Sequence, residues 1–263
     1  MASLDLRRIL AGWDYEPNQI TVRKVLGDDG SVKIQMRVDL GILQMESTGR
    51  PDGTRPHGFE SLLAYHEHRL ARHQELNGTE LGFELSAEEC AALRDESIQY
   101  YHRYLAEFVL EDFDGVEADT ARNLRTLELC RRFAREDADR QSLERHRPYL
   151  IMMNTRARAH LALRRGAFKT ALARVQAGLK LIHACLVALD QEESFEELTE
   201  VRILQSLAEE IAARLPADPL QRLERELQRA LNEERYEDAA VLRDRIAAIQ
   251  SGQTGSVSRK RPG

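Results

Sequence analysis

The histidines of this 263-residue chain are candidate metal ligands, because imidazole commonly binds metal ions in proteins. His57, His66, His68 and His73 fall in one stretch, and Glu67 separates the middle two. On a helix, residues two apart point about 200° away from each other, so His66 and His68 cannot share an ion. The His-Glu-x-x-His spacing of zinc proteases is also absent. The sequence therefore predicts no metal site.

The segment 100–104, Tyr-Tyr-His-Arg-Tyr, mixes aromatic and basic residues, as some surfaces that bind single-stranded nucleic acid do. On a helix, however, Tyr100 and Tyr104 share one face, which favours packing over base stacking. The basic triplet at 259–261 would add only weak, salt-sensitive phosphate contacts. Direct nucleic-acid binding is therefore not expected.

No catalytic grouping can be assembled from the sequence. The phosphate loop Gly-x4-Gly-Lys-Ser/Thr is absent, and no Ser/His/Asp or Cys/His grouping is found. Carboxylate pairs such as Glu192-Glu193 and Glu196-Glu197 are typical of a charged surface. We expect a protein without enzymatic activity, cofactor or small-molecule substrate. A small enzyme that uses the Gly49–Gly58 loop and the nearby histidines is an alternative.

Composition indicates a soluble, helix-rich protein of the cytoplasm. Charged residues make up 31% of the chain and aromatic residues 6%, with only 15 glycines and 7 prolines. The net charge of −6 provides no basic field for nucleic acid or an anionic membrane. Three cysteines without a Cys-x-x-Cys pair exclude a thiolate zinc ribbon and indicate a reducing compartment. No signal peptide is evident, and no apolar run approaches the ~20 residues of a membrane span.

The first 56 residues are predicted to form a β-hairpin region. Every even position from Val32 to Ile42 is apolar, which is the period-2 pattern of a half-buried strand. A second strand precedes it around 20–26, joined by the loop Gly-Asp-Asp-Gly at 27–30. Two strands are only marginally stable, so a helix, a partner chain or a third strand near Leu43–Ser47 must cover them.

After the Gly- and Pro-rich loop at 49–56, the apolar period changes to 3.6, which predicts a helical body from 57 to 214. Ser86 and Glu89 form a capping-box pattern. A proline-interrupted break at 216–219 separates this body from a hairpin at 218–250, and residues 251–263 are predicted to be a disordered basic tail. The expected helices are 58–77, 86–112, 115–137, 143–165, 168–190, 193–214, 219–234 and 236–250.

Comparing the chain with itself at an offset of 55 residues places Phe113 on Phe168. Gly166, Phe168 and Ala171 match the Gly-x-Tyr-x-x-Ala turn of tetratricopeptide repeats, which this region resembles. Glu111 replaces the glycine in the first copy, and the offset exceeds the usual repeat of about 34 residues. The resemblance implies antiparallel helical hairpins with long helices. A plain helical bundle is the alternative.

The most specific pattern lies at 218–250. A leucine-rich segment precedes Tyr-Glu-Asp-Ala-Ala-Val-Leu-Arg-Asp-Arg-Ile at 236–246. This segment closely resembles the UVR motif, a helical hairpin shared by the UvrB and UvrC subunits of bacterial excision repair, some Clp-type ATPases and adaptors that activate protein-arginine kinases. The resemblance implies a hairpin that binds another UVR hairpin. The chain departs from the ATPases by lacking a phosphate loop and from the zinc-bearing kinase activators by lacking Cys-x-x-Cys pairs.

Helical spacing assigns the apolar and small side chains of this hairpin to two surfaces. Ala239 also falls on the stripe of the second helix that faces the first. In an alternative arrangement, the partner-binding surface docks on the chain's own body. The seam between the two helices is predicted to consist of Leu220, Leu223, Leu227, Leu231, Leu242, Ile246 and Ile249. The partner-binding surface is predicted to consist of Tyr236, the aromatic wedge of the turn, with Ala239, Ala240, Arg243, Asp244 and Ala247.

These patterns together predict a mostly α fold: tetratricopeptide-like antiparallel hairpins, an N-terminal β-hairpin and a C-terminal UVR hairpin. The expected function is that of a bacterial interaction adaptor. Its partner would be another UVR-bearing protein, namely a Clp-type ATPase, a protein-arginine kinase system, a repair subunit or a second copy of the chain. The alternative is an accessory protein of nucleotide excision repair that binds UvrB or UvrC.

Overall fold

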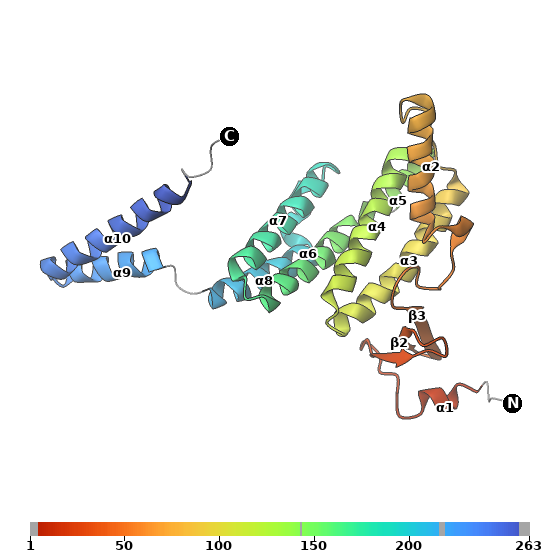
Figure 1. Ribbon diagram of the computed structural model, residues 1–263, viewed down its shortest axis with the longest axis horizontal. Coiled ribbons are helices and arrows are strands. Elements are labelled where there is room, and N and C mark those ends of the chain that lie inside the picture. Colours follow the sequence, from red (N-terminus) through yellow and green to blue (C-terminus); the bar gives the residue numbers. More distant parts are fainter. Residues whose placement is uncertain (1–4, 143, 216–218, 258–263) are drawn as a thin grey trace. The chain divides into compact units, whose positions relative to one another are not determined.

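The computed structural model describes residues 5–142, 144–215 and 219–257. The chain divides into two compact units, Met1–Ile211 and Ala212–Gly263. Within the described ranges, the first unit holds a three-stranded antiparallel sheet and a helical body, and the second holds a helical hairpin (Figure 1). The prediction of a mostly α fold with an N-terminal antiparallel sheet and a C-terminal helical hairpin is confirmed.

The sheet has the order β1 (Val22–Leu26), β2 (Val32–Val38) and β3 (Gly41–Glu46), after a short helix α1 (Arg7–Leu10). The prediction of one strand from Val32 to Ile42 is wrong, because the chain reverses at Asp39-Leu40, where Leu40 is 90% exposed. Val38 pairs with Gly41 across this two-residue turn, so even positions of β2 share a face with odd positions of β3. The apolar alternation of even positions continues through the turn. The even positions of β2 and those of β3 nevertheless lie on opposite faces of the sheet.

One face of the sheet packs against α3 (Ala87–Val109). Ile34, Met36 and Met45 form a buried cluster with Ala106 of this helix. Arg103 donates hydrogen bonds from the same helix to the carbonyl oxygens of Glu46 and Gly49, at 3.1 and 2.7 Å. The first 56 residues therefore belong to the same compact unit as the helices, and the predicted boundary at 56 separates no independent domain.

The helical body is built from long helices connected by short turns. The predicted capping box is present, because Ser86 and Glu89 exchange hydrogen bonds at the start of α3. The predicted helix 115–137 ends earlier, at Phe133, where Ala134 becomes extended and pairs with Leu85. The remaining elements are η1 (Pro56–Gly58), α2 (Leu62–Asn77), α4 (Phe113–Phe133), α5 (Asp137–Ser142), η2 (Glu144–His146), α6 (Arg147–Arg164), α7 (Phe168–Val187), η3 (Glu192–Glu197) and α8 (Thr199–Arg214).

The 55-residue offset corresponds to two helix-to-helix turns with the same backbone geometry. Glu111 and Gly166 both have left-handed backbones, with φ of 56° and 67°. The next N–H in each turn reaches back five residues, at 2.8 Å after Glu111 and 2.9 Å after Gly166. An aromatic residue, Phe113 or Phe168, then begins the following helix. Glutamate therefore occupies a position that favours glycine, at a conformational cost of order 1 kcal/mol.

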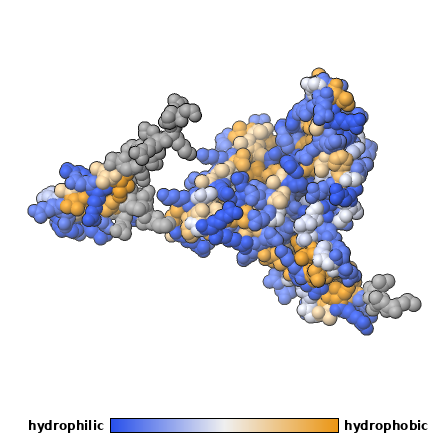
Figure 2. All heavy atoms as spheres, viewed as in Figure 1, coloured by the Kyte–Doolittle hydropathy of each residue, from blue (hydrophilic) through white to orange (hydrophobic). Residues whose placement is uncertain are grey.

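Helix α7 is long and apolar enough, by length and composition alone, to cross a bilayer, and it is the one such helix among the described residues. By contrast, uninterrupted apolar runs in the sequence predict no segment long enough to span a membrane. The side of α7 formed by Ala171, Val175, Gly178, Ile182 and Leu186 is buried in the core, which also contains residues of α3, α4, α6 and α8. We interpret α7 as a core helix of the body. The face drawn in Figure 2 is largely hydrophilic, with smaller apolar areas.

Candidate functional site

The C-terminal hairpin consists of α9 (Pro219–Asn232) and α10 (Tyr236–Val257). Its turn repeats the geometry of the two turns in the body. Glu234 has φ of 56°, and the N–H of Arg235 donates to the carbonyl oxygen of Ala230 at 2.8 Å. Tyr236 then begins the second helix, as Phe113 and Phe168 do in the body. The second helix continues seven residues beyond the predicted end at 250, so 251–257 are helical, and 258–263 lie outside the described residues.

The seam between α9 and α10 differs from the prediction at one position. Leu231 is 43% exposed, and Ala230, only 1% exposed, lies in the seam instead. Helical phase alone does not separate the two positions, because Ala230 lies about 20° around the helix from Leu223 and about 60° from Leu227, and Leu231 lies about 80° and about 40° from them. The side chain of Leu220 lies outside the described residues. The other predicted seam residues, Leu223, Leu227, Leu242, Ile246 and Ile249, are half-buried.

Two of the predicted partner-binding residues have different surroundings from those expected. Ala239 is 5% exposed and belongs to the seam, so its assignment to the partner-binding surface is wrong. Tyr236 is 66% exposed and is no wedge within the hairpin. Buried alanines at positions 230 and 239, on either side of the turn, let the two helices approach closely there.

The remaining predicted residues are exposed on α10. Tyr236, Ala240, Arg243 and Ala247 lie within about 60° of one another around the helix axis, and we call these four the Tyr236 stripe. Asp244 lies at its edge, 3.8 Å from Arg243, and the two side chains are 77% and 74% exposed. An exposed ion pair of this length contributes little stability, so both charges are available to another chain.

Comparison with protein-family models matches residues 218–252 to the UvrB/uvrC motif. Residues 218–252 are a UVR motif. Neither a curated protein sequence nor a solved structure matches the chain. The UVR motif covers α9, the turn and most of α10, and we refer to this element as the UVR hairpin. In Figure 2, hydrophobic residues lie among the hydrophilic ones on this unit.

The UVR hairpin and the α3–α4 hairpin differ in the surroundings of the aromatic residue that begins the second helix. Phe113 is 6% exposed, because His160 of α6 stacks on its ring with centroids 4.5 Å apart. The Arg164 guanidinium lies over the same ring at 4.6 Å. Tyr236 holds the equivalent position in the UVR hairpin and is 66% exposed. In the body, a third helix, α6, covers this position. In the UVR hairpin, the same position is open.

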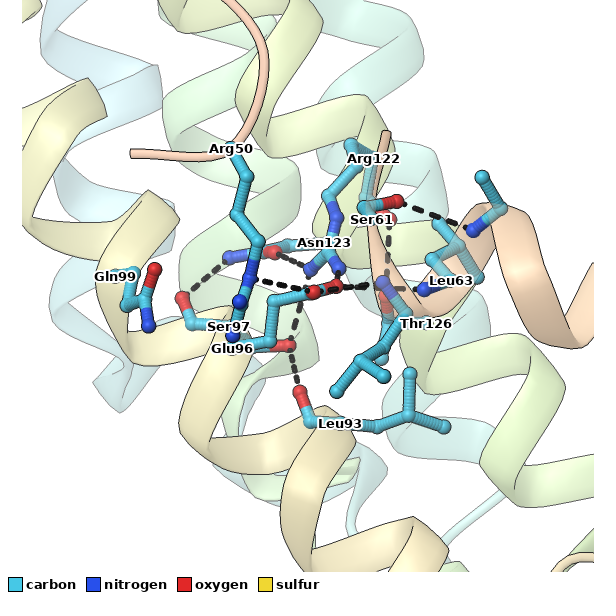
Figure 3. Close-up of polar contacts among 12 residues, drawn as sticks. Arg50, Ser61, Leu63, Leu93, Glu96, Ser97, Gln99, Arg122, Asn123 and Thr126 are labelled. Carbon is cyan, nitrogen blue, oxygen red and sulfur yellow. Dashed lines mark hydrogen bonds and ion pairs between the residues drawn. The ribbon is translucent and has the colours of Figure 1, made fainter. Parts of the chain in front are cut away.

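A buried ionic cluster lies around Glu96 in the body, and the sequence analysis did not identify it (Figure 3). Glu96 is 0% exposed and accepts hydrogen bonds from the N–H groups of Leu62 and Leu63, at 2.7 and 3.3 Å. Arg50 lies 3.0 Å from one of its oxygens, and Arg122 pairs with the other. The carboxylate is thus occupied by the N-terminus of α2 and two arginines, which indicates a structural role.

A second buried cluster connects α3 to α4. Arg103 binds Asp119 through two hydrogen bonds of 2.8 and 2.7 Å. Glu107 lies 3.8 Å from Arg103, and its Oε2 atom has no hydrogen-bond partner. Burial, together with the charge of Asp119, raises the pKa of Glu107 to about 8. Gly115 makes room for this carboxyl group, since a Cβ there would lie 2.5 Å from it.

Glu107 is expected to make the stability of the body depend on pH. A carboxyl group with a raised folded-state pKa stabilises the fold most below its ordinary pKa of 4.5, and this contribution is lost as the pH rises through about 8. Between about pH 5 and pH 9, the wild type should lose roughly 2–4 kcal/mol of unfolding free energy relative to Glu107→Gln. Urea unfolding of both proteins at the two pH values measures this. Parallel pH profiles would show that Glu107 is ionised throughout.

The histidines considered as metal ligands do not gather. Within the described ranges, no group of three His, Cys, Asp or Glu side chains could hold a metal ion. His66 is 2% exposed, and burial lowers its pKa to about 4. His57 stacks on Tyr65, with ring centroids 4.1 Å apart. His66 therefore packs within the body, whereas His57 is exposed and its ring lies against Tyr65.

Proposed function

We propose that the protein is an interaction adaptor whose UVR hairpin binds a helix of another UVR-bearing protein. The observation that carries this proposal is the exposed Tyr236 at a position that α6 covers in the body. The two hairpins share the same turn, so the open position in the UVR hairpin suits a third helix from elsewhere. A Clp-type ATPase, a protein-arginine kinase system, a repair subunit or a second copy of the chain would provide such a helix.

The Tyr236 stripe defines the chemistry of the partner. The aromatic ring provides a large apolar contact, and Ala240 and Ala247 let another helix approach closely. Arg243 requires a carboxylate opposite it, because an unpaired charge in a desolvated interface is costly. We therefore propose a partner helix with small apolar residues and an acidic side chain in register with Arg243. The adaptor would act without enzymatic activity of its own, in the bacterial cytoplasm.

A role in excision repair is the second candidate, because the matched motif is that of UvrB and UvrC. The chain would then bind one of these subunits and reach DNA only through it. The identity of the captured partner distinguishes the two candidates. Repair subunits would support the second, whereas a Clp-type ATPase or an arginine kinase system would support the first.

Capture of partners from a bacterial lysate tests the proposal. Leu227→Asp places a charge in the half-buried seam and should unfold the UVR hairpin while the body stays folded. Partners that themselves carry a UVR motif should be recovered with the wild type and lost with Leu227→Asp. Circular dichroism of the two proteins checks that only a small share of helix is lost. Equal recovery of those partners by both proteins would contradict the proposal.

A further inference from the structure

A cavity of about 820 Å³ lies in the helical body, lined by residues of α3, α4, α5, η2 and α6. This volume falls within the range of sites that hold small molecules, about 300–1,000 Å³. All of its lining residues belong to the first compact unit, so the cavity is independent of the UVR hairpin and of the function proposed for it.

Three of the residues that line this cavity are tyrosines. The ring of Tyr101 meets Tyr104 edge-on, with centroids 5.5 Å apart, and tilts toward Tyr149 at 6.3 Å. Tyr101 and Tyr104 belong to the aromatic and basic segment at 100–104. The sequence analysis assigned Tyr104 to packing, and the structure shows that it packs and also lines the cavity. Such rings favour a flat aromatic ligand, which gains stacking or edge contacts with each of them.

Tyr104 brings a hydrogen-bonding group to the cavity. Its side chain is 2% exposed and forms part of the cavity lining. Burial raises the pKa of this phenol, so it is a neutral donor. A polar atom of a ligand in the cavity could form a hydrogen bond with this hydroxyl.

The polar groups on the deep side of the cavity are already occupied. Asn123 donates to the carbonyl oxygen of Ser97 at 3.0 Å and accepts from Arg122 at 2.8 Å. At the rim, Arg94 pairs with Asp139 at 2.6 Å, which neutralises its charge and joins α5 to α3. These groups hold the walls of the cavity in place. Because they already have partners, other lining residues must bind a ligand.

Arg145 of η2 is the lining cation with no carboxylate partner among the described residues. Its Nε atom donates to His146 at 3.1 Å. Burial lowers the pKa of both His102 and His146, so these two rings are neutral near pH 7. The guanidinium of Arg145 therefore gives the rim an uncompensated positive charge that suits an anion.

We infer that this cavity binds a small planar aromatic anion. The aromatic part lies against Tyr101 and Tyr149, a polar group forms a hydrogen bond with the hydroxyl of Tyr104, and the acidic group pairs with Arg145. No covalent step is involved, so the site is one of binding alone.

Fluorescence titration of the full-length chain with 8-anilinonaphthalene-1-sulfonate tests this inference. Its uncharged counterpart, N-phenyl-1-naphthylamine, has the same aromatic skeleton without the sulfonate. We expect one sulfonate dye bound per chain, about 10-fold or more tighter than the uncharged dye, because a hydrogen bond to a charged group has that effect on affinity. Equal affinity for the two dyes, or no binding of the sulfonate, would overturn the inference.

Variants then locate the binding site. Arg145→Gln should abolish the preference for the sulfonate, whereas Arg165→Gln, a change of another exposed arginine outside the cavity lining, should leave it intact. Tyr104→Phe removes one hydroxyl and should weaken binding of the sulfonate about 5-fold. Thermal unfolding confirms that each variant is folded. Unchanged binding in Arg145→Gln would show that the dye lies elsewhere and would refute the site.

Discussion

Replacing Glu96 with alanine is expected to lower the free energy of unfolding of the body by roughly 3–5 kcal/mol, because it leaves buried charges without a partner. Arg122 is 8% exposed and would lose the carboxylate that compensates its guanidinium. Burial already lowers the pKa of Arg122 to about 9, which shows how unfavourable its charge is in this site. The N–H groups of Leu62 and Leu63 would also lose their acceptor at the start of α2. Urea unfolding followed by circular dichroism measures the change.

An exposed ion pair provides the matched control. Glu128 pairs with Arg131 at 2.6 Å, but the two side chains are 41% and 52% exposed, so Glu128→Ala should lower stability by less than about 1 kcal/mol. The double variant Glu96→Leu/Arg122→Leu should be more stable than Glu96→Ala, since it removes the two most deeply buried charges of this cluster and Arg50 keeps Asp52 as a partner at 3.0 Å. A loss below about 1 kcal/mol in Glu96→Ala would contradict the structural role of the cluster.

Reversing one charge on the Tyr236 stripe should weaken partner binding by about 30- to 4,000-fold, which corresponds to roughly 2–5 kcal/mol for a misplaced charge in a desolvated interface. Arg243→Glu makes this change at a side chain that is 74% exposed. The UVR hairpin should keep its helical content, because Arg243 lies outside the seam. Affinity for the captured UVR-bearing partner, measured by titration calorimetry, gives the effect.

Arg245→Glu is the control for this change. It alters the net charge of α10 equally, two residues further along the helix, and Arg245 lies about 180° around the helix from Tyr236. Binding should stay within a few-fold of the wild type. If the two variants weaken binding equally, the effect comes from overall charge and the Tyr236 stripe is not the interface.

The features that could be predicted from the sequence are those that a local pattern encodes. The UVR hairpin was predicted from its leucines and its Tyr-Glu-x-Ala-Ala segment, and the capping box from Ser86 and Glu89. Local pattern gave a wrong prediction for one residue of the hairpin seam and for the length of one strand. Leu231 is more apolar than Ala230, yet the alanine lies in the seam and the leucine is exposed. The alternation through Asp39-Leu40 hides a turn, because both strands alternate on their own.

The clusters around Glu96 and Arg103 could not be predicted from the sequence, because their members lie far apart along the chain. Glu96 contacts Arg50 and Arg122, and Arg103 contacts the backbone at Glu46 and Gly49. In the sequence, each is one more charge among the 31% of charged residues. Only the packing of the loop and of α2 against α3 and α4 reveals that they are buried.

Photo-cross-linking in living bacteria tests the partner-binding role of the Tyr236 stripe most directly. The photoreactive p-benzoyl-phenylalanine replaces Tyr236 in one protein and Val241, which lies about 140° around α10, in another. Position 236 should cross-link to a UVR motif of another polypeptide, and position 241 should not. Cross-links from position 236 only to residues of the chain's own body, or equal cross-linking from both positions, would contradict this role.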